Sequence, residues 1–316
     1  MNPGPQGPEA KVLQSAERQH AAHSSTMVSV VVNIVLTVAQ VITGVWAGSQ
    51  ALVADGLHSL SDLLSDFVVL LANRHSHKEA DADHQYGHRR FETAASLALG
   101  LLLLGVSAGM IWQAVLKLTG SEPPEPVHGV ALAVAALTLV CKEGLFRYLL
   151  AVAQRVRSSM LVANAWHARS DAASSLVVAL GIGGSLAGLP LLDPVAALIV
   201  GLIVGRMGLS FGWNALNDLM DRAASDEQVA EIQRVLEDTP GVLGVHDLRT
   251  RKMGDLILVD AHLDVDESLS VKQGHDISVV ARERLMRELP VLDLMTHLDP
   301  VPGPRRSSAP SGAGVV

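Results

Sequence analysis

The chain has 316 residues, of which 49% are hydrophobic and 3% aromatic, and its formal net charge is −8. This apolar composition excludes a single soluble domain and indicates several membrane spans with a soluble extension. The one cysteine, Cys141, excludes an intrachain disulfide and a metal site built from several thiolates. The acidic balance argues against nucleic acid as a partner, since nucleic-acid binding normally requires a basic surface.

Residues 1–25 are polar and lack the charged start and apolar core of a signal peptide. We expect them to form a cytoplasmic N-terminal tail.

Six apolar segments follow, each near the roughly 20 residues that a helix needs to cross a bilayer. They cover Met27–Trp46, Ala51–Asn73, Ala94–Leu116, Val127–Leu150, Met160–Leu186 and Val195–Trp213. The fifth begins with polar residues, but its later part is apolar and rich in glycine, so we count it as a span. The pattern predicts a membrane α-helical domain of six transmembrane helices over residues 26–215.

Basic residues gather in two of the connections between these segments. The second-to-third connection contains Arg74, Lys78, Arg89 and Arg90, whereas the turns at 48–50 and 188–193 contain no Lys or Arg. By the positive-inside rule, both termini are expected in the cytoplasm.

After Asp218 the chain becomes charged and reads as a soluble domain over residues 216–301. Asp226–Glu237 and Val271–Glu288 have helical patterns, and Val242–Arg251, Asp255–Val265 and Asp293–Leu298 have strand patterns. This αββαβ order predicts a cytoplasmic, ferredoxin-like α+β C-terminal domain. Residues 302–316, rich in Pro, Ser and Gly, are expected to be disordered.

Two predicted spans each carry a His and an Asp four residues apart, His58 with Asp62 and His167 with Asp171. Residues at i and i+4 share one face of a helix, so two facing helices would supply two nitrogens and two oxygens to a tetrahedral cation. Each ionisable group at membrane depth costs about 2.5–3.5 kcal/mol, which makes these side chains functional candidates. The alternative is that they only hydrogen-bond helices together.

The order of the motifs resembles the cation diffusion facilitator family of divalent-metal/proton antiporters. The motifs are Gly48-Ser49, the segments Ala54–Asp62, Asp81–His88 and Asn164–Asp171, and His246-Asp247-Leu248-Arg249. The resemblance covers nearly all of the chain outside the tails. It implies a homodimeric exporter in a lipid membrane, expected to be a bacterial inner membrane.

The resemblance makes His58, Asp62, His167 and Asp171 the transport site. Two carboxylates balance a divalent cation, and two imidazoles suit Zn²⁺ better than Ca²⁺ or Mg²⁺. Protons compete with metal for the same atoms, which is the basis of antiport. Fe²⁺, Mn²⁺, Co²⁺ and Cd²⁺ stay open as substrates, and His58 is the position on which the metal preference most depends.

Two further acidic residues share roughly one face with the second-span pair. We expect Asp55 in the outer approach to the site and Asp66 in the cytoplasmic approach. For Asp66, pairing with a neighbouring basic residue is an equal alternative.

The resemblance implies two more metal sites and one ion pair. Asp81, His84 and His88 match a loop zinc site, for which a locally helical loop would align the two histidines. Arg90 matches a basic partner of Asp221, as an interlock between the membrane and soluble parts. A cytoplasmic regulatory site is implied at His246, His262, His275, His297 and Asp299. The alternatives are a merely histidine-rich loop and solvated surface histidines.

Other classes of protein also contain metal-binding side chains. An intramembrane metalloenzyme is disfavoured because no His-Glu-x-x-His motif occurs and four ligands would close the site. A transporter of iron(II) or manganese(II) is the alternative within the family, and a non-transporting metal sensor or scaffold is the alternative outside it.

Overall fold

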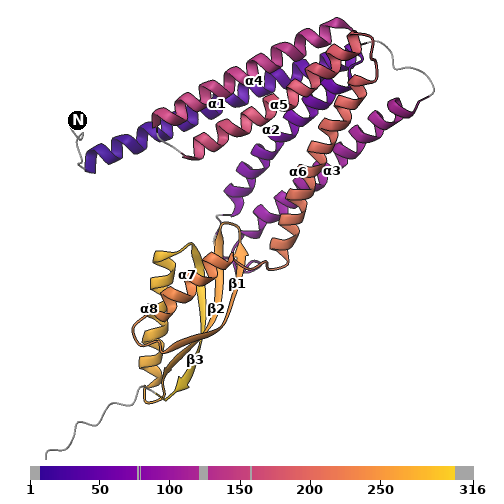
Figure 1. Cartoon of the computed structure of the whole chain (residues 1–316). Coiled ribbons are helices and arrows are strands. Elements are labelled where there is room, and N and C mark those ends of the chain that lie inside the picture. Colours follow the sequence, from indigo (N-terminus) through magenta and orange to yellow (C-terminus); the bar gives the residue numbers. More distant parts are fainter. Residues whose placement is uncertain (1–7, 77, 79, 121–126, 157–158, 303–316) are drawn as a thin grey trace, which may run out of the picture. The chain divides into compact units, whose positions relative to one another are not determined.

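The structure is a computed structural model that describes residues 8–76, 78, 80–120, 127–156 and 159–302. The side chains of residues 8–23, 66, 69–75, 156, 159, 160 and 163 lie outside the description. The chain forms two compact units, residues 1–71 with 96–212 and residues 72–95 with 213–316. The first is entirely helical where it is described, and the second contains the only sheet in the described chain (Figure 1).

Six long helices account for the predicted spans, and this part of the fold prediction is confirmed. They are α1 (Pro8–Ala47), α2 (Gln50–Ser76), α3 (Arg90–Thr119), α4 (Gly129–Val156), α5 (Ser159–Leu186) and α6 (Leu192–Leu219). Helix α1 begins well before the first apolar segment, so it includes most of the expected N-terminal tail.

Four of the helices are long and apolar enough to cross a membrane, judged over the described residues. These stretches are Ser24–Ala47, Arg90–Thr119, Gly129–Arg155 and Leu192–Leu219. Helices α2 and α5, which carry the His–Asp pairs, are not among the four. In α5 the polar residues of the Asn164–Asp171 motif lower the hydropathy, as the composition of this segment predicts.

Helices α3 and α6 approach each other closely through glycines. A Cβ atom added at Gly100 would lie only 2.6 Å from the backbone nitrogen of Gly212 and 3.0 Å from the carbonyl oxygen of Gly208. Farther along, the Ser107 hydroxyl donates a hydrogen bond to the Gly201 carbonyl oxygen at 2.8 Å. Small residues and interhelical hydrogen bonds are what bring membrane helices together, because lipid leaves little hydrophobic drive between them.

Asp193, at the start of α6, holds the start of α2. Its carboxylate accepts hydrogen bonds from the Ser49 hydroxyl at 2.5 Å and from the backbone N–H of Gln50 at 2.8 Å. A carboxylate at a helix N-terminus satisfies free N–H groups and favours the helix dipole. The turn at 48–50 therefore lies at the same end of the bundle as the start of α6, opposite to the α6 end that continues into the second unit.

The second unit follows the predicted αββαβ order. Its elements are α7 (Asp226–Glu237), β1 (Gly244–Met253), β2 (Leu256–Asp266), α8 (Val271–Glu288) and β3 (Val291–Val301). The sheet order is β1-β2-β3, with β1 antiparallel and β3 parallel to β2. Residues 303–316, for which we expected disorder, lie outside the described residues.

One face of this sheet forms a core with the two helices. Alternate β2 residues such as Val259 and Leu263 are buried with Ile232 and Leu236 of α7 and Leu285 of α8. The intervening β2 residues face the other side, because side chains alternate along a strand. That other face is where the polar residues of the domain are available for binding.

Capping boxes fix where α7 and α8 begin. Ser225 and Gln228 bond reciprocally at the start of α7, and Ser270 and Gln273 do the same at the start of α8. This pairing satisfies two backbone N–H groups that would otherwise lack partners. The helix boundaries predicted from sequence agree with these caps.

Candidate metal centres

The membrane triad consists of His58 and Asp62 on α2 and Asp171 on α5. One ligand atom from each residue lies within 4.8 Å of the other two. His58 Nδ1 is 3.8 Å from Asp62 Oδ2, and its Nε2 is 3.9 Å from Asp171 Oδ1. Both imidazole nitrogens thus face a carboxylate.

The donor set of the membrane triad fits a divalent transition metal. His58 Nδ1 is buried and has no hydrogen-bond partner within the described chain. A buried polar atom normally has a partner, so an unpaired nitrogen between carboxylates indicates a site for a cation. Two carboxylates and an imidazole also suit zinc and its neighbours better than calcium or magnesium.

His167 lies outside the membrane triad. It is on α5 one turn before Asp171, and its side chain is exposed. The adjacent Arg169 guanidinium stacks over the rings of Phe146 and Trp166, at 4.8 and 5.3 Å from the ring centroids. His167 as a fourth ligand stays a prediction, which requires its imidazole to turn toward the triad.

Asp55, which we expected in the outer approach to the site, is buried and paired. Its carboxylate lies 3.5 Å from the ammonium of Lys142 on α4, and the two side chains are 1% and 3% exposed. Lys142 is a candidate functional residue that the motif comparison passed over. An ionisable side chain within an apolar helix is the signal that would have found it. The side chain of Asp66 lies outside the described residues.

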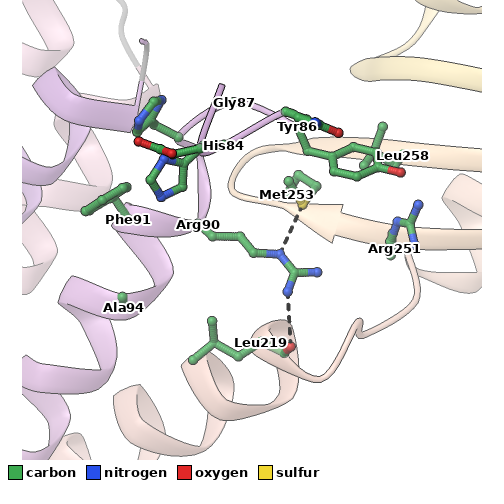
Figure 2. A pocket seen from close by; sticks show the side chains of 13 residues that line it. His84, Tyr86, Gly87, Arg90, Phe91, Ala94, Leu219, Arg251, Met253 and Leu258 are labelled. Atoms are coloured by element: carbon green, nitrogen blue, oxygen red, sulfur yellow. Dashed lines mark hydrogen bonds between the residues drawn. The ribbon is translucent and has the colours of Figure 1, made fainter. Parts of the chain in front are cut away.

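In the second unit, Arg90 lines a cavity of about 560 Å³ and contacts three groups, two of which, Leu219 and Met253, are drawn in Figure 2. It forms an ion pair with Asp221 and donates hydrogen bonds to the Met253 sulfur at 3.4 Å and the Leu219 carbonyl oxygen at 3.5 Å. The structure thus brings the predicted partners Arg90 and Asp221 together. Their role as an interlock stays a prediction.

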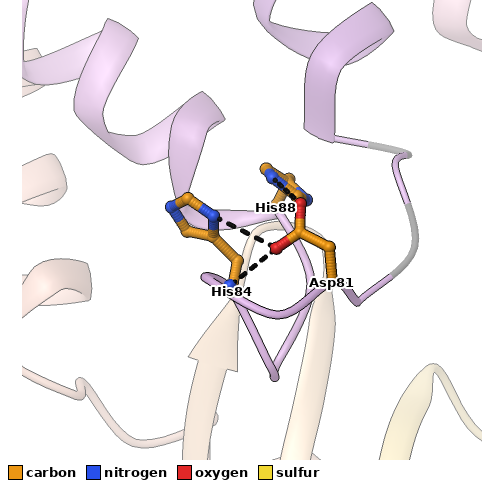
Figure 3. Close-up of side chains that lie close together, drawn as sticks. All are labelled: Asp81, His84 and His88. Carbon is orange, nitrogen blue, oxygen red and sulfur yellow. Dashed lines mark hydrogen bonds and ion pairs between the residues drawn. The ribbon is translucent and has the colours of Figure 1, made fainter.

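The loop triad consists of Asp81, His84 and His88 (Figure 3). Asp81 Oδ1 is 3.5 Å from His84 Nδ1, and Oδ2 is 3.3 Å from His88 Nε2. A backbone hydrogen bond from His84 holds the pKa of Asp81 below its ordinary value, and the charge of His88 acts in the same direction. The carboxylate is therefore ionised and ready to bind a cation.

The loop is not helical between Asp81 and His88, so the helical alignment of the two histidines does not apply. Bends and a turn join Asp81 to His88, and Gly87 has a φ of +78°, which a helix does not contain. A glycine adopts this left-handed conformation without steric cost. The turn, rather than a helix, brings the two imidazoles to a centroid distance of 4.4 Å.

In the sheet, strand register aligns three histidines into what we call the histidine row, His246, His262 and His297. His246 on β1 pairs with His262 on β2, which pairs with His297 on β3. Their rings are 5.1 and 4.7 Å apart in turn.

Asp299 joins the histidine row from β3. Its Oδ2 atom is 2.9 Å from His262 Nδ1 and 3.2 Å from His246 Nε2, and Oδ1 is 3.3 Å from His297 Nε2. The hydrogen bond with His262 lowers the pKa of Asp299, and the charges of the three histidines act in the same direction. His246, His262 and Asp299 offer ligand atoms within 4.8 Å of one another.

Two residues alter the predicted cytoplasmic set. Asp264 was missed, and its Oδ1 lies 3.3 Å from His246 Nε2. Its position two residues after His262 on β2 places it on the same face and could have identified it. His275 is exposed on α8 and is not in the group around Asp299.

Two family models match the chain. The cation efflux transmembrane domain matches residues 26–220, and the cation efflux protein cytoplasmic domain matches residues 224–301. Together they include the membrane triad, the loop triad and the histidine row.

Several characterised or named proteins are similar over most of this chain. Metal tolerance protein C1 of Arabidopsis thaliana is 35% identical over 283 residues, 85% of this chain and 60% of that protein. The magnetosome protein MamB of Paramagnetospirillum magneticum is 32% identical, over 85% of this chain and 91% of that protein. The manganese efflux system protein MneP of Bacillus subtilis is 28% identical, over 90% of this chain and 98% of that protein. The chain thus spans about three fifths of the plant protein and nearly all of the two bacterial ones.

Proposed function

Because the chain belongs to the cation efflux, or cation diffusion facilitator, family of divalent-metal transporters, we propose that it exports zinc from the cytoplasm in exchange for protons. Members of this family are transporters and not enzymes. The membrane triad carries the proposal, because it is the one cluster of candidate metal ligands in the described part of the helical unit.

Charge and protonation supply the mechanism. Asp62 and Asp171 together neutralise a divalent cation, so that an occupied site is close to neutral within the membrane. His58 must be deprotonated at the nitrogen that binds, and the carboxylates must be ionised. Protons arriving from the far side compete for these atoms and release the ion, and loss of the protons to the cytoplasm restores the empty site.

Zinc is favoured by the mixed nitrogen and oxygen ligands, with His167 as the proposed fourth ligand. Manganese(II) or iron(II) is the second candidate, because the similar protein MneP is named a manganese efflux system protein. A ligand set alone does not determine selectivity in this series of metals.

The proposal extends to the oligomeric state, the membrane location and two further zinc sites. We propose a homodimer in a lipid membrane, with both termini in the cytoplasm. A bacterial inner membrane is the proposed location. The histidine row, with Asp299, is the proposed regulatory zinc site, and the loop triad is a further proposed zinc site.

The test is uptake into vesicles that hold the full chain with its cytoplasmic face outward. An acidic lumen should drive uptake of Zn²⁺, with Fe²⁺, Mn²⁺, Co²⁺ and Cd²⁺ compared in parallel. Asp171→Ala should abolish the proton-dependent part. Intact uptake by this variant would refute the site. If no metal moves while the cytoplasmic domain still binds zinc, the sensor alternative is correct.

A further inference from the structure

Beside the membrane triad lies a second buried cluster, built around an ion pair that we call the outer pair, Asp55 and Lys142. The Lys142 ammonium is 3.5 Å from Asp55 Oδ1 and donates a hydrogen bond to the Ser59 hydroxyl at 3.1 Å. Asp55 also accepts a hydrogen bond from the Gln40 amide. At 1% and 3% exposure, both charged groups are removed from solvent.

The cluster connects four helices. Its members are Gln40 on α1, Asp55 and Ser59 on α2, Lys142 on α4, and Ser174 and Ser175 on α5. A buried ion pair has little advantage if its only role is to join helices, because an apolar pair of similar volume is often as stable. Its retention inside a membrane domain therefore indicates a role in function.

The cluster is also joined to an ion ligand. Ser175 Oγ lies 2.7 Å from Asp55 Oδ2 and 3.2 Å from the backbone carbonyl oxygen of Asp171, so this hydroxyl joins the Asp55 carboxylate to the turn of α5 that carries Asp171. Ser59, which receives the Lys142 hydrogen bond, directly follows His58 in α2. The outer pair is thus hydrogen-bonded to both helices that carry the ion ligands.

The outer pair has a defined position relative to the ion site. Asp55 precedes His58 by about one helical turn, toward the 48–50 turn that Asp193 holds against the start of α6. That end of the bundle is opposite to the α6 end that continues into the cytoplasmic domain. The outer pair therefore lies on the side of the membrane triad through which an exported ion leaves.

The charges of Asp55 and Lys142 determine how the outer pair affects a bound metal ion. Lys142 neutralises Asp55, which leaves the charges of Asp62 and Asp171 to match one divalent cation. If the pair separated while metal occupied the triad, the lysine would repel the ion and the free carboxylate would attract it outward. An ion pair that is stable when closed and able to act on the ion when open has the properties of a gate.

Resting on the proposed function, we infer that Asp55 and Lys142 form the outer gate of the transport site, an ion pair that must part before the metal ion leaves the membrane triad. Lys142→Met leaves Asp55 without its counter-ion, so that this carboxylate retains the ion. We expect the maximal uptake rate to fall roughly tenfold or more without an increase in the half-saturating zinc concentration. Asp55→Asn with Lys142→Met removes both charges, and this variant should fold, bind zinc and recover part of the rate lost in Lys142→Met, because no free carboxylate then retains the ion.

The experiment measures zinc and proton fluxes in the same vesicles, for the two variants, for Lys142→Arg and for Lys117→Met. Lys142→Arg keeps the charge and should retain most of the rate, while Lys117→Met, near the end of α3, should behave as wild type. A wild-type rate in Lys142→Met, or an equal loss of rate in Lys142→Met and in the double variant, would overturn the gate. Loss of folding or of zinc binding in the double variant would also overturn it, because the pair would then be structural or part of the binding site. If the wild-type protein moves no metal, the proposed function fails instead.

Discussion

The membrane triad and the histidine row use similar ligands in opposite environments. His58 is 3% exposed, whereas the side chains of His262 and Asp299 are 37% and 31% exposed. The buried site has two carboxylates for one imidazole, and the Asp55 charge beside it is balanced by Lys142. The exposed site has three imidazoles around the Asp299 carboxylate, with the Asp264 carboxylate beside His246.

The difference shows how burial restricts the choice of ligands. At a solvent-exposed position, a histidine can be either neutral or protonated, because water stabilises its charge. Within a membrane, the charges of ligands and ion must cancel, or occupancy becomes too costly. The buried site is thus suited to exchange metal for protons, and the exposed row to bind metal without a matched exchange.

The largest expected effect comes from removing a charge of the buried site. Asp171→Asn keeps the shape of the side chain but leaves one carboxylate to balance a divalent ion. Mutating a residue that only hydrogen-bonds to a metal ligand already lowers metal affinity or activity about 10–100-fold. For the loss of a ligand charge itself, we expect proton-driven zinc uptake to fall at least about 100-fold. Uptake within a few-fold of wild type would contradict the claim that the buried site, unlike the exposed one, requires two carboxylate charges to balance the ion.

Loss of a central ligand in the histidine row should have a smaller effect. His262→Ala should shift the cytoplasmic zinc concentration that activates uptake upward by about 10-fold, while the maximal rate persists. The measurement is uptake at a series of zinc concentrations on the cytoplasmic face. His275→Ala is the matched control, because this exposed histidine lies outside the group, and an equal shift in both variants would refute the row as the regulatory site.

A smaller, purely structural effect is expected at the start of α7. Ser225→Ala removes the side-chain acceptor of the capping box and should cost about 1 kcal/mol in local stability. Hydrogen exchange of residues 226–237 in the full chain should accelerate, while zinc uptake stays unchanged. Unaltered exchange in α7 would show that the cap contributes nothing to its stability.

The smallest expected effect is that of moderate acidification on the protonation of Asp299. The pKa of Asp299 lies below its ordinary value of 3.8, so its stabilising contribution is fully present above that value. It is lost only as the pH falls through the lowered pKa. In the zinc-free protein, Asp299 should therefore stay ionised between about pH 5 and 7, so the carbon NMR signal of its carboxyl should show only the small changes caused by neighbouring groups, and the full shift change of a carboxylate that becomes protonated in that range would contradict the assigned contacts.

Much of the fold was predictable because its signals are local. Apolar length indicated six helices, and the capping serines Ser225 and Ser270 stand where the predicted helices of the cytoplasmic domain begin. The αββαβ element order was predicted from the hydrophobic periodicity, whereas the strand order β1-β2-β3 was established only by the structure. The extension of α1 back to Pro8 was not predicted, since a polar helix outside the membrane has no hydropathy signal.

The candidate sites were predictable only in part, because they depend on contacts between distant segments. The i, i+4 spacing placed His58 beside Asp62, but it gave no information on whether His167 faces inward. Lys142 and Asp264 were passed over because neither belongs to a motif, and each becomes a candidate only when its partner on another element is known. The loop triad was predicted from the family resemblance, but the turn at Gly87 that brings its imidazoles together could not be predicted from the i, i+4 spacing.

The central claim is that the membrane triad binds metal at the expense of protons, and counting both fluxes in one vesicle preparation tests it most directly. With wild-type protein, zinc entry into an acidic lumen should be accompanied by proton exit at a fixed ratio. With Asp171→Asn, both fluxes should be lost together. Zinc entry that continues at the same rate without proton exit, in either protein, would contradict the account.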